Sequence, residues 1–194
     1  EITTKTLKTL NTSRDDYAPR FANKTNRIAF ISNRTGSREV YIANLDGDIL
    51  AVTKLGKGVN PNHLFWSPDD ATLFFVDNEY LYQINTANGL HQKKAFPYPT
   101  GFLTSVSNDG KSFYFASDHN QDWQVYRMEG NSTIQVTQSG GYEAIEDPTS
   151  RNLYFTKFRS KGLWRKDLVE GTEEILIADI DVLIPGSFAL FEDT

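Results

Sequence analysis

The sequence predicts an all-β fold, a β-propeller made of four-stranded antiparallel blades. A short turn recurs at residues 68–71, 108–111 and 148–151, so that successive copies are 40 residues apart. An apolar strand follows each turn, and an aromatic residue marks the strand after that. A period near 40 with signals for four strands per period is typical of propeller blades. The alternative, a β-sandwich, requires the spacing to be a coincidence.

The landmarks of the repeat agree in register along the chain. The strand after the turn is expected at residues 28–30, 73–75, 113–115 and 153–155. The next strand carries Tyr41, Tyr82, Tyr126 and Trp164 in the four copies. Aromatic and β-branched residues suit the pleated, half-buried surface of a strand. We therefore expect the two middle strands of each blade to pack aromatic side chains in the core.

In chain order, residues 1–12 resemble the closing strand of a blade whose other strands are missing. Four complete blades are then expected at approximately residues 18–58, 59–101, 102–141 and 142–183, and residues 184–194 begin a fifth copy. Either the two partial ends combine into one blade or the chain is a slice of a larger ring. We favour the slice, because the last copy stops before its second strand is complete.

Composition excludes several classes of function. The 194 residues carry 20 Lys and Arg against 25 Asp and Glu, a formal net charge of −5, with no basic stripe of the kind that binds nucleic acid. The absence of cysteine removes disulfides, thiolate nucleophiles and Cys-based metal sites. No apolar run is long enough to span a membrane and no signal peptide is recognisable, so membrane attachment would need a span outside these residues.

Catalytic motifs are missing as well. The sequence has no G-x-S-x-G nucleophile elbow, no Walker motif and no G-x-G-x-x-G loop. The histidines His63, His91 and His119 lack the close spacing of metal ligands. Residues 118–122 could contribute oxygen and nitrogen ligands, but a solvated loop is the better explanation. We predict a protein that is not an enzyme and has no metal or other cofactor, although a pair of carboxylates brought together by two loops stays open.

The blade topology predicts where a binding site would lie. The loops between the second and third strands, and those between successive blades, emerge on one face, while the tight turns emerge on the other. Loops on a rigid scaffold commonly carry function. We expect a small ligand or a protein partner to bind this loop face, or else its residues are ordinary solvated side chains. The candidates are Arg34, His63, Asp118, His119, Tyr142 and Arg159.

Three stretches carry a family resemblance. Ser67-Pro68-Asp69-Asp70, residues 28–36 (IAFISNRTG) and residues 40–47 (VYIANLDG) resemble the repeat of TolB-type propellers, and the similarity extends over residues 16–191. Residues 140–174 are similar to the C-terminal propellers of membrane-anchored winged-helix transcription regulators, the CadC/ToxR-like group. In that group a cytoplasmic DNA-binding domain and one membrane span precede a periplasmic sensing domain.

This resemblance implies a periplasmic domain that senses a ligand or contacts a protein, while a winged helix outside these residues binds DNA. Two alternatives stay open, because related repeats also form the substrate-gating propeller of prolyl-oligopeptidase-like serine peptidases and free TolB-like periplasmic scaffolds. Open strand edges at both ends of the chain are compatible with a homodimer or with strand exchange.

Overall fold

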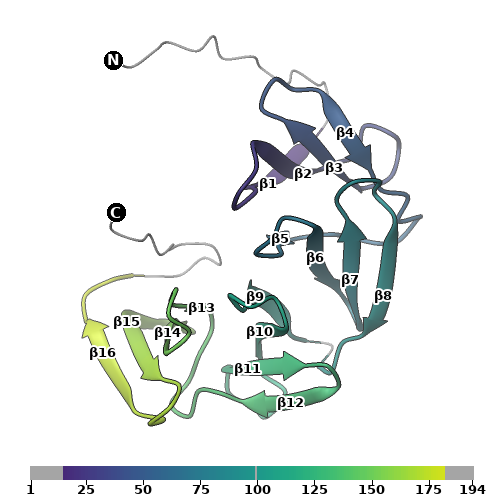
Figure 1. Ribbon diagram of the computed structural model, residues 1–194. Helices are drawn as coiled ribbons and strands as arrows, with labels where there is room; N and C mark the ends of the chain where they lie inside the picture. The colour runs from purple at the N-terminus through teal and green to yellow at the C-terminus, as the bar shows by residue number, and fades with distance from the viewer. Residues whose placement is uncertain (1–14, 99, 182–194) are drawn as a thin grey trace, which may run out of the picture. The chain divides into compact units, whose positions relative to one another are not determined.

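The computed structural model describes residues 15–98 and 100–181. These residues divide into two compact units with the boundary between Lys94 and Ala95, and each unit is described by itself. All strands belong to four antiparallel sheets of four strands each (Figure 1). No helix occurs in the described ranges. The predicted all-β fold is therefore confirmed, while the partial blades expected at residues 1–12 and 184–194 lie outside the described residues.

The first unit contains two sheets with the strand orders β1-β2-β3-β4 and β5-β6-β7-β8. The first sheet consists of β1 (Asp16–Phe21), β2 (Arg27–Ser32), β3 (Glu39–Asn44) and β4 (Ile49–Val52). The second consists of β5 (Phe65–Trp66), β6 (Thr72–Asp77), β7 (Tyr80–Asn85) and β8 (His91–Ala95).

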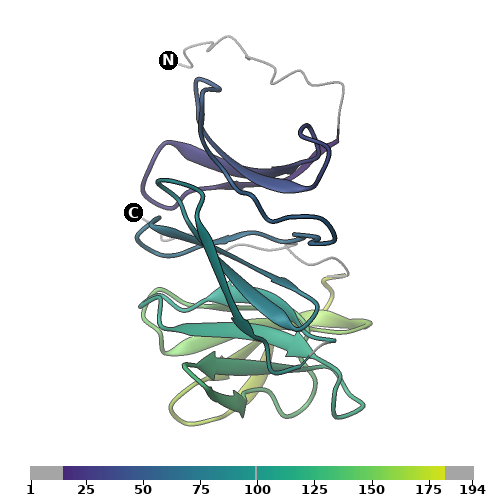
Figure 2. The same ribbon diagram turned by 90° about the vertical axis from the view of Figure 1, so that its right-hand side faces the viewer.

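The second unit repeats this up-and-down order in two further sheets. One consists of β9 (Phe102–Val106), β10 (Ser112–Ser117), β11 (Gln124–Glu129) and β12 (Ser132–Gln135). The other consists of β13 (Ala144–Glu146), β14 (Asn152–Lys157), β15 (Ser160–Asp167) and β16 (Glu173–Ile177). The strands within a sheet are twisted relative to one another, as the side view in Figure 2 shows.

The repeated aromatic residues meet across the two middle strands of every sheet. The four pairs stand directly opposite each other in the strand register: Phe30 and Tyr41, Phe75 and Tyr82, Phe115 and Tyr126, and Phe155 and Trp164. Their ring centroids are 5.5, 4.6, 5.5 and 6.4 Å apart, in the same order. Such pairs contribute about 0.5–1.5 kcal/mol beyond the burial of their area. The expected role of these residues in the core is confirmed.

Neighbouring sheets share an apolar core within each unit. In the first unit, Ile31 and Val40 of one sheet belong to the same buried cluster as Leu73 and Phe75 of the next. In the second unit, Tyr114 and Val125 pack in one cluster with Leu153 and Phe155. The sheets of a unit are therefore packed on each other, as propeller blades are.

The turn that defines the repeat keeps its backbone shape where its sequence varies. Asp70, Gly110 and Ser150 occupy the same turn position and have φ values of 61°, 72° and 57°. This left-handed conformation favours glycine, and asparagine or aspartate adopts it more readily than other residues. The turn of the fourth copy thus lacks the Asp-Gly pair of the family pattern without losing the geometry.

Asp70 also connects the two blades of the first unit through its carboxylate. The side chain is completely buried. It accepts hydrogen bonds from the backbone amides of Asn23 at 2.7 Å and of Lys24 and Thr25 at 2.8 Å. Burial opposes ionisation of the carboxyl group, but these hydrogen bonds outweigh it and lower the pKa of Asp70. The carboxylate thereby holds the turn between β1 and β2 against the turn between β5 and β6.

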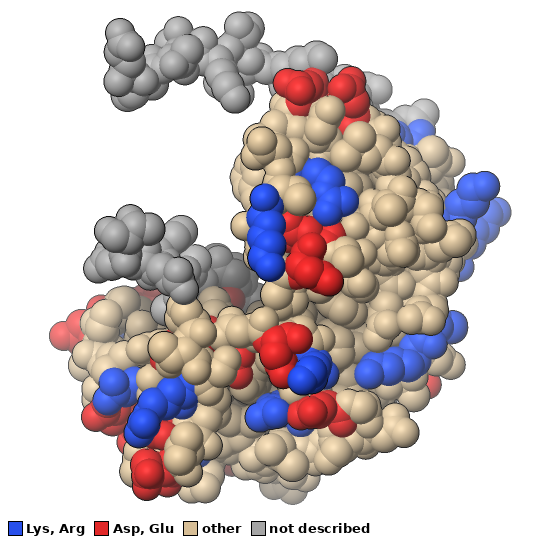
Figure 3. Space-filling model, viewed as in Figure 1, with Lys and Arg blue, Asp and Glu red and all other residues tan. Residues whose placement is uncertain are grey.

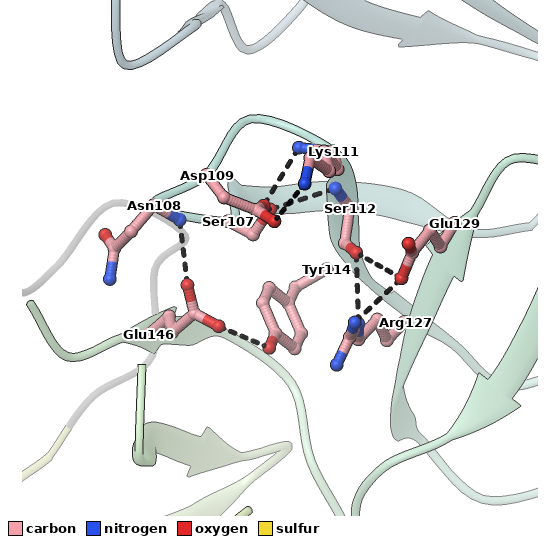
Figure 4. Close-up of polar contacts among 9 residues, drawn as sticks. All are labelled: Ser107, Asn108, Asp109, Lys111, Ser112, Tyr114, Arg127, Glu129 and Glu146. Carbon is pink, nitrogen blue, oxygen red and sulfur yellow. Dashed lines mark hydrogen bonds and ion pairs between the residues drawn. The ribbon is translucent and has the colours of Figure 1, made fainter. Parts of the chain in front are cut away.

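A corresponding polar contact connects the blades of the second unit (Figure 4). Glu146 on β13 accepts a hydrogen bond of 3.0 Å from the Tyr114 hydroxyl and one of 2.8 Å from the backbone amide of Asn108. Burial, together with the negative charge of Glu146, raises the pKa of Tyr114 above its ordinary value. The phenol therefore stays protonated and donates its hydrogen bond at all physiological pH values.

Candidate functional site

Two of the six candidate residues, Arg34 and His63, lie in the first unit. Arg34, between β2 and β3, donates to the Asp16 carboxylate at 3.0 Å, and its guanidinium carbon lies 4.6 Å from the centre of the Tyr41 ring. His63 precedes β5 and is half-buried. Burial, and then the nearby charge of Arg20, lower the pKa of His63. Arg34 is thus engaged in contacts that hold its own blade together.

The other four candidates lie in the second unit. His119 stacks on Tyr98, with ring centroids 3.7 Å apart, and Asp118 precedes it in the same loop between β10 and β11. Tyr142 lies in the connection from β12 to β13, and Arg159 in the two-residue turn between β14 and β15. The structure thus brings loops that are far apart in the sequence to one end of the two sheets.

A cleft of about 560 Å³ lies at this end of the second unit. It is open to solvent, and its volume falls within the range of about 300–1,000 Å³ typical of small-molecule sites. Ten residues from three connections and the adjoining strand ends line it: Gln121, Asp122, Trp123, Gln124, Gln138, Ser139, Gly140, Lys157, Phe158 and Ser160. Two sequence candidates, Tyr142 and Arg159, adjoin these lining residues in the chain.

An aromatic cluster forms one wall of the cleft. The Trp123 and Phe158 rings are 5.6 Å apart, and the Tyr142 ring lies 5.1 Å from Trp123 and 5.0 Å from Phe158. Phe102 at the start of β9 packs against the cluster, and its ring centroid lies 5.0 Å from that of Tyr142. Edge-on and tilted contacts of this kind fix the ring orientations. The wall is therefore pre-formed, which reduces the entropy lost when a ligand binds.

A partly buried carboxylate on β16 holds the segment of the cleft that contains Gln138 and Ser139. Glu173 accepts hydrogen bonds from the Ser139 hydroxyl at 2.6 Å and the Gln138 backbone amide at 2.9 Å, and it pairs with Lys166 at 3.3 Å. Burial opposes ionisation of Glu173, but these partners together lower its pKa. The Gly141 amide donates to the Trp123 carbonyl at 2.8 Å. These contacts fix the segment from Gln138 to Gly141 against the blade.

Ser139 and Lys157 are 2.9 Å apart, an arrangement that activates the serine in some hydrolases. Here the single hydroxyl proton of Ser139 is donated to Glu173, which accepts only, so Lys157 must be the donor to Ser139. Lys157 therefore cannot take the proton that a general base would remove. Its ammonium also lies 3.2 Å from the centre of the Trp164 ring. These contacts connect Ser139 to Lys157 at the end of β14 and to Glu173 on β16.

The charges around the site are mixed in sign. Lys157 ends β14, Arg159 lies in the turn that follows and Lys161 belongs to β15. Asp118 and Asp122 belong to the loop between β10 and β11. On the visible face of each unit, basic and acidic side chains are interspersed (Figure 3). In the described ranges no group of His, Cys, Asp or Glu is arranged to hold a metal ion. A search of the same residues for helices that could cross a membrane found none.

Several residues of the cleft were not among the sequence candidates. β11 begins at Gln124, so Trp123 lies at the end of the loop between β10 and β11. Phe158 stands just beyond β14 and is 40% exposed. The sequence does carry a signal for Trp123 and Phe158, because both are aromatic residues at the end of a strand rather than at a repeated core position. No such signal marks Gln138, Ser139 or Lys157. Gln138 and Ser139 are held by Glu173 on β16, and Lys157 in turn contacts Ser139.

No family model and no curated protein matches the chain. Solved β-propeller structures do match it. TolB from Acinetobacter baumannii superposes with a TM-score of 0.66 at 19% identity, over 85% of this chain and 44% of TolB. A putative TolB from Agrobacterium tumefaciens gives 0.58 at 18% identity, over 77% of this chain and 60% of that protein. A prolyl endopeptidase gives 0.57 at 13% identity, over 86% of this chain and 29% of that protein.

These matches define the class of fold. The four sheets are β-propeller blades, and their likeness to TolB and to a peptidase propeller confirms the prediction at the level of the fold. At identities below 20% the matches carry no functional information. The chain also spans less than two thirds of each of the three proteins. None of them is a CadC/ToxR-like regulator, so that narrower resemblance stays a prediction.

Proposed function

We propose that this β-propeller is a non-catalytic binding domain that recognises a ligand or protein partner at the cleft of its second unit. In its specific form, the proposal makes the chain the periplasmic sensing domain of a membrane-anchored transcription regulator of the CadC/ToxR-like type. Binding at the cleft changes blade packing or self-association, and a membrane span outside these residues relays the change to a DNA-binding domain.

The observation that carries the proposal is the pre-formed aromatic wall on the loop face of the second unit. Trp123, Tyr142 and Phe158 hold one another in fixed orientations, and Phe158 remains 40% exposed. No histidine or cysteine lines the cleft, and its lining combines aromatic rings with exposed amide and hydroxyl groups. These features support binding without chemistry. The assignment to a regulator rests on the sequence resemblance of residues 140–174.

The parent gene and a deletion test the proposal. A winged helix and one apolar span encoded before residue 1 are expected for a regulator, and removal of residues 15–181 from the full-length protein should abolish its response to its signal. An upstream region without a DNA-binding domain, or a response that persists after the deletion, contradicts the regulator proposal.

A substrate-gating role in a serine peptidase is the second candidate. The structural match to a prolyl endopeptidase, which extends over 86% of this chain, shows that the fold is compatible with this role. An α/β-hydrolase domain encoded beside the propeller would decide for this role. A free periplasmic scaffold, as the TolB likeness suggests, predicts a signal peptide and neither additional domain.

We further propose that the chain forms homodimers through open strand edges. The outer strand β16 presents the consecutive apolar side chains Ile175, Leu176 and Ile177, each 43–47% exposed. An exposed apolar edge is a common site of strand pairing. Sedimentation should show a dimer that Leu176→Lys dissociates; a chain that is monomeric at all concentrations contradicts the proposal.

A further inference from the structure

The hydrogen-bonding groups of the cleft indicate the chemistry of its ligand. Gln121, Asp122, Gln138 and Ser160 are exposed at its surface and supply amide, carboxylate and hydroxyl groups. Side-chain amides both donate and accept, and a carboxylate accepts in two directions. This set matches a ligand that carries several hydroxyl groups, each of which also donates and accepts.

The aromatic wall adds an apolar surface beside these polar groups. Trp123 and Phe158 both line the cleft, and Tyr142 and Phe102 brace them from behind. A flat ring with apolar C–H faces and polar edges can therefore contact the aromatic side chains while its edges reach the amides. Sugar rings have this shape.

Arg159 adds a positive charge at the rim. Its guanidinium carbon lies 4.9 Å from the centre of the exposed Phe158 ring, and none of the described carboxylates pairs with it. A guanidinium recognises a carboxylate through two parallel hydrogen bonds. Lys157 provides a second cation in the same cleft.

An extended peptide fits the cleft less well. The cleft is lined by loops and by the ends of β11, β14 and β15, and each of these strands is already paired on both sides. A peptide would find no open strand edge with which to form backbone hydrogen bonds. A ligand recognised through side chains alone is the better match.

We propose that the cleft binds an acidic saccharide, that is, a sugar ring bearing a carboxylate, which stacks on Trp123 and Phe158 and pairs with Arg159. This rests on the proposed function, since it names the ligand of the same cleft. The carboxylate is the feature that distinguishes the ligand from neutral sugars, because Arg159 is a cation beside the exposed Phe158 ring and none of the described carboxylates forms an ion pair with it.

Calorimetric titration of the 194-residue chain with digalacturonic acid and with its methyl ester tests the proposal. The two ligands share the same sugar rings, and the ester replaces each carboxylate with a neutral methyl ester. The acid should bind at least about tenfold more tightly than the ester, the ratio expected for one charge-assisted hydrogen-bonded pair. Arg159→Gln should remove this difference and leave the affinity for the ester unchanged. Trp123→Ala should lower the affinity for both ligands.

Lys111→Gln is the matched control, because Lys111 is an exposed cation in the turn at the other end of β10. It should bind both ligands as the unmodified chain does, and circular dichroism should show all variants folded. Equal affinity for acid and ester, an unchanged ratio in Arg159→Gln, or preference for an acidic or proline-rich peptide overturns the proposal. If no saccharide binds but cleft substitutions abolish the response of the full-length protein, this proposal fails and the proposed function stands.

Discussion

The carboxylate of Asp70 provides the sharpest test of how neighbouring blades are held together. Replacing Asp70 with glycine removes the acceptor for three backbone amides, at 2.7, 2.8 and 2.8 Å. Hydrogen bonds to a charged group contribute about 1.5–3 kcal/mol each. The turn that contains residues 23–25 is exposed, so water replaces part of this loss, and glycine removes a left-handed strain of about 1 kcal/mol. We expect Asp70→Gly to destabilise the chain by about 2–4 kcal/mol.

Ser150→Gly is the control, because Ser150 occupies the same turn position with a φ of 57° and lies in the other unit. Its hydroxyl accepts one exposed hydrogen bond, from Asn108 at 3.1 Å. The relief of strain and the lost bond nearly cancel, so we expect a change of less than about 1 kcal/mol. Urea unfolding measures both variants, and hydrogen exchange at the amides of residues 23–25 reports the contact locally. If Asp70→Gly were as stable as the unmodified chain, the reasoning would be refuted.

The effect of Asp70 must also depend on pH. The pKa of Asp70 is lower in the folded state than in the unfolded state. Its contribution to the free energy of unfolding is therefore complete above the unfolded pKa of about 3.9, and it is lost as the pH falls through the folded pKa. The difference in stability between the unmodified chain and Asp70→Gly should therefore be constant near neutral pH and shrink in acid. A difference that grows as the pH falls would contradict the assigned sign.

Three further predictions concern the blades and the cleft. A methyl group on Gly141 would lie 2.8 Å from Val125, so Gly141→Ala should destabilise the second unit by about 1–3 kcal/mol in urea unfolding and weaken ligand binding. Glu173→Gln should lower stability near neutral pH, with the difference vanishing in acid, because the pKa of Glu173 is lowered in the folded state; a pH-independent difference contradicts this. Ser139→Ala and the unmodified chain should hydrolyse a simple aryl ester at the same background rate. Hydrolysis by the unmodified chain that Ser139→Ala abolishes would contradict the proposal that the cleft binds without catalysing a reaction.

The repeat made the fold predictable from the sequence. Because blades are copies of one unit, Phe30 and Tyr41 predict the positions of Phe115 and Tyr126, and the structure pairs both sets across the same two strands. Strand alternation then fixes which side chains enter the core. The turn at Ser150 was harder, since its left-handed backbone carries neither Gly nor Asp.

The cleft was only partly predictable. Tyr142 and Arg159 were expected on the loop face because topology alone places those connections there. Arg34, expected on the same face, belongs to the first unit and pairs there with Asp16, 18 residues earlier in the chain. Lys157 and Ser139 acquire their positions from Glu173, which is more than ten residues from either in the sequence. Contacts between residues so far apart in the sequence form only when the blades pack, and no local sequence pattern predicts them.

The central claim is that the chain acts by binding at the cleft of its second unit. The most direct measurement compares the signal response of the full-length protein carrying Trp123→Ala with that of the protein carrying Lys111→Ala. Trp123 forms the wall of the cleft, whereas Lys111 lies in the turn at the opposite end of β10. The account predicts that the response is lost with Trp123→Ala and retained with Lys111→Ala. An equal response from both variants, each folded and present at normal levels, would contradict it.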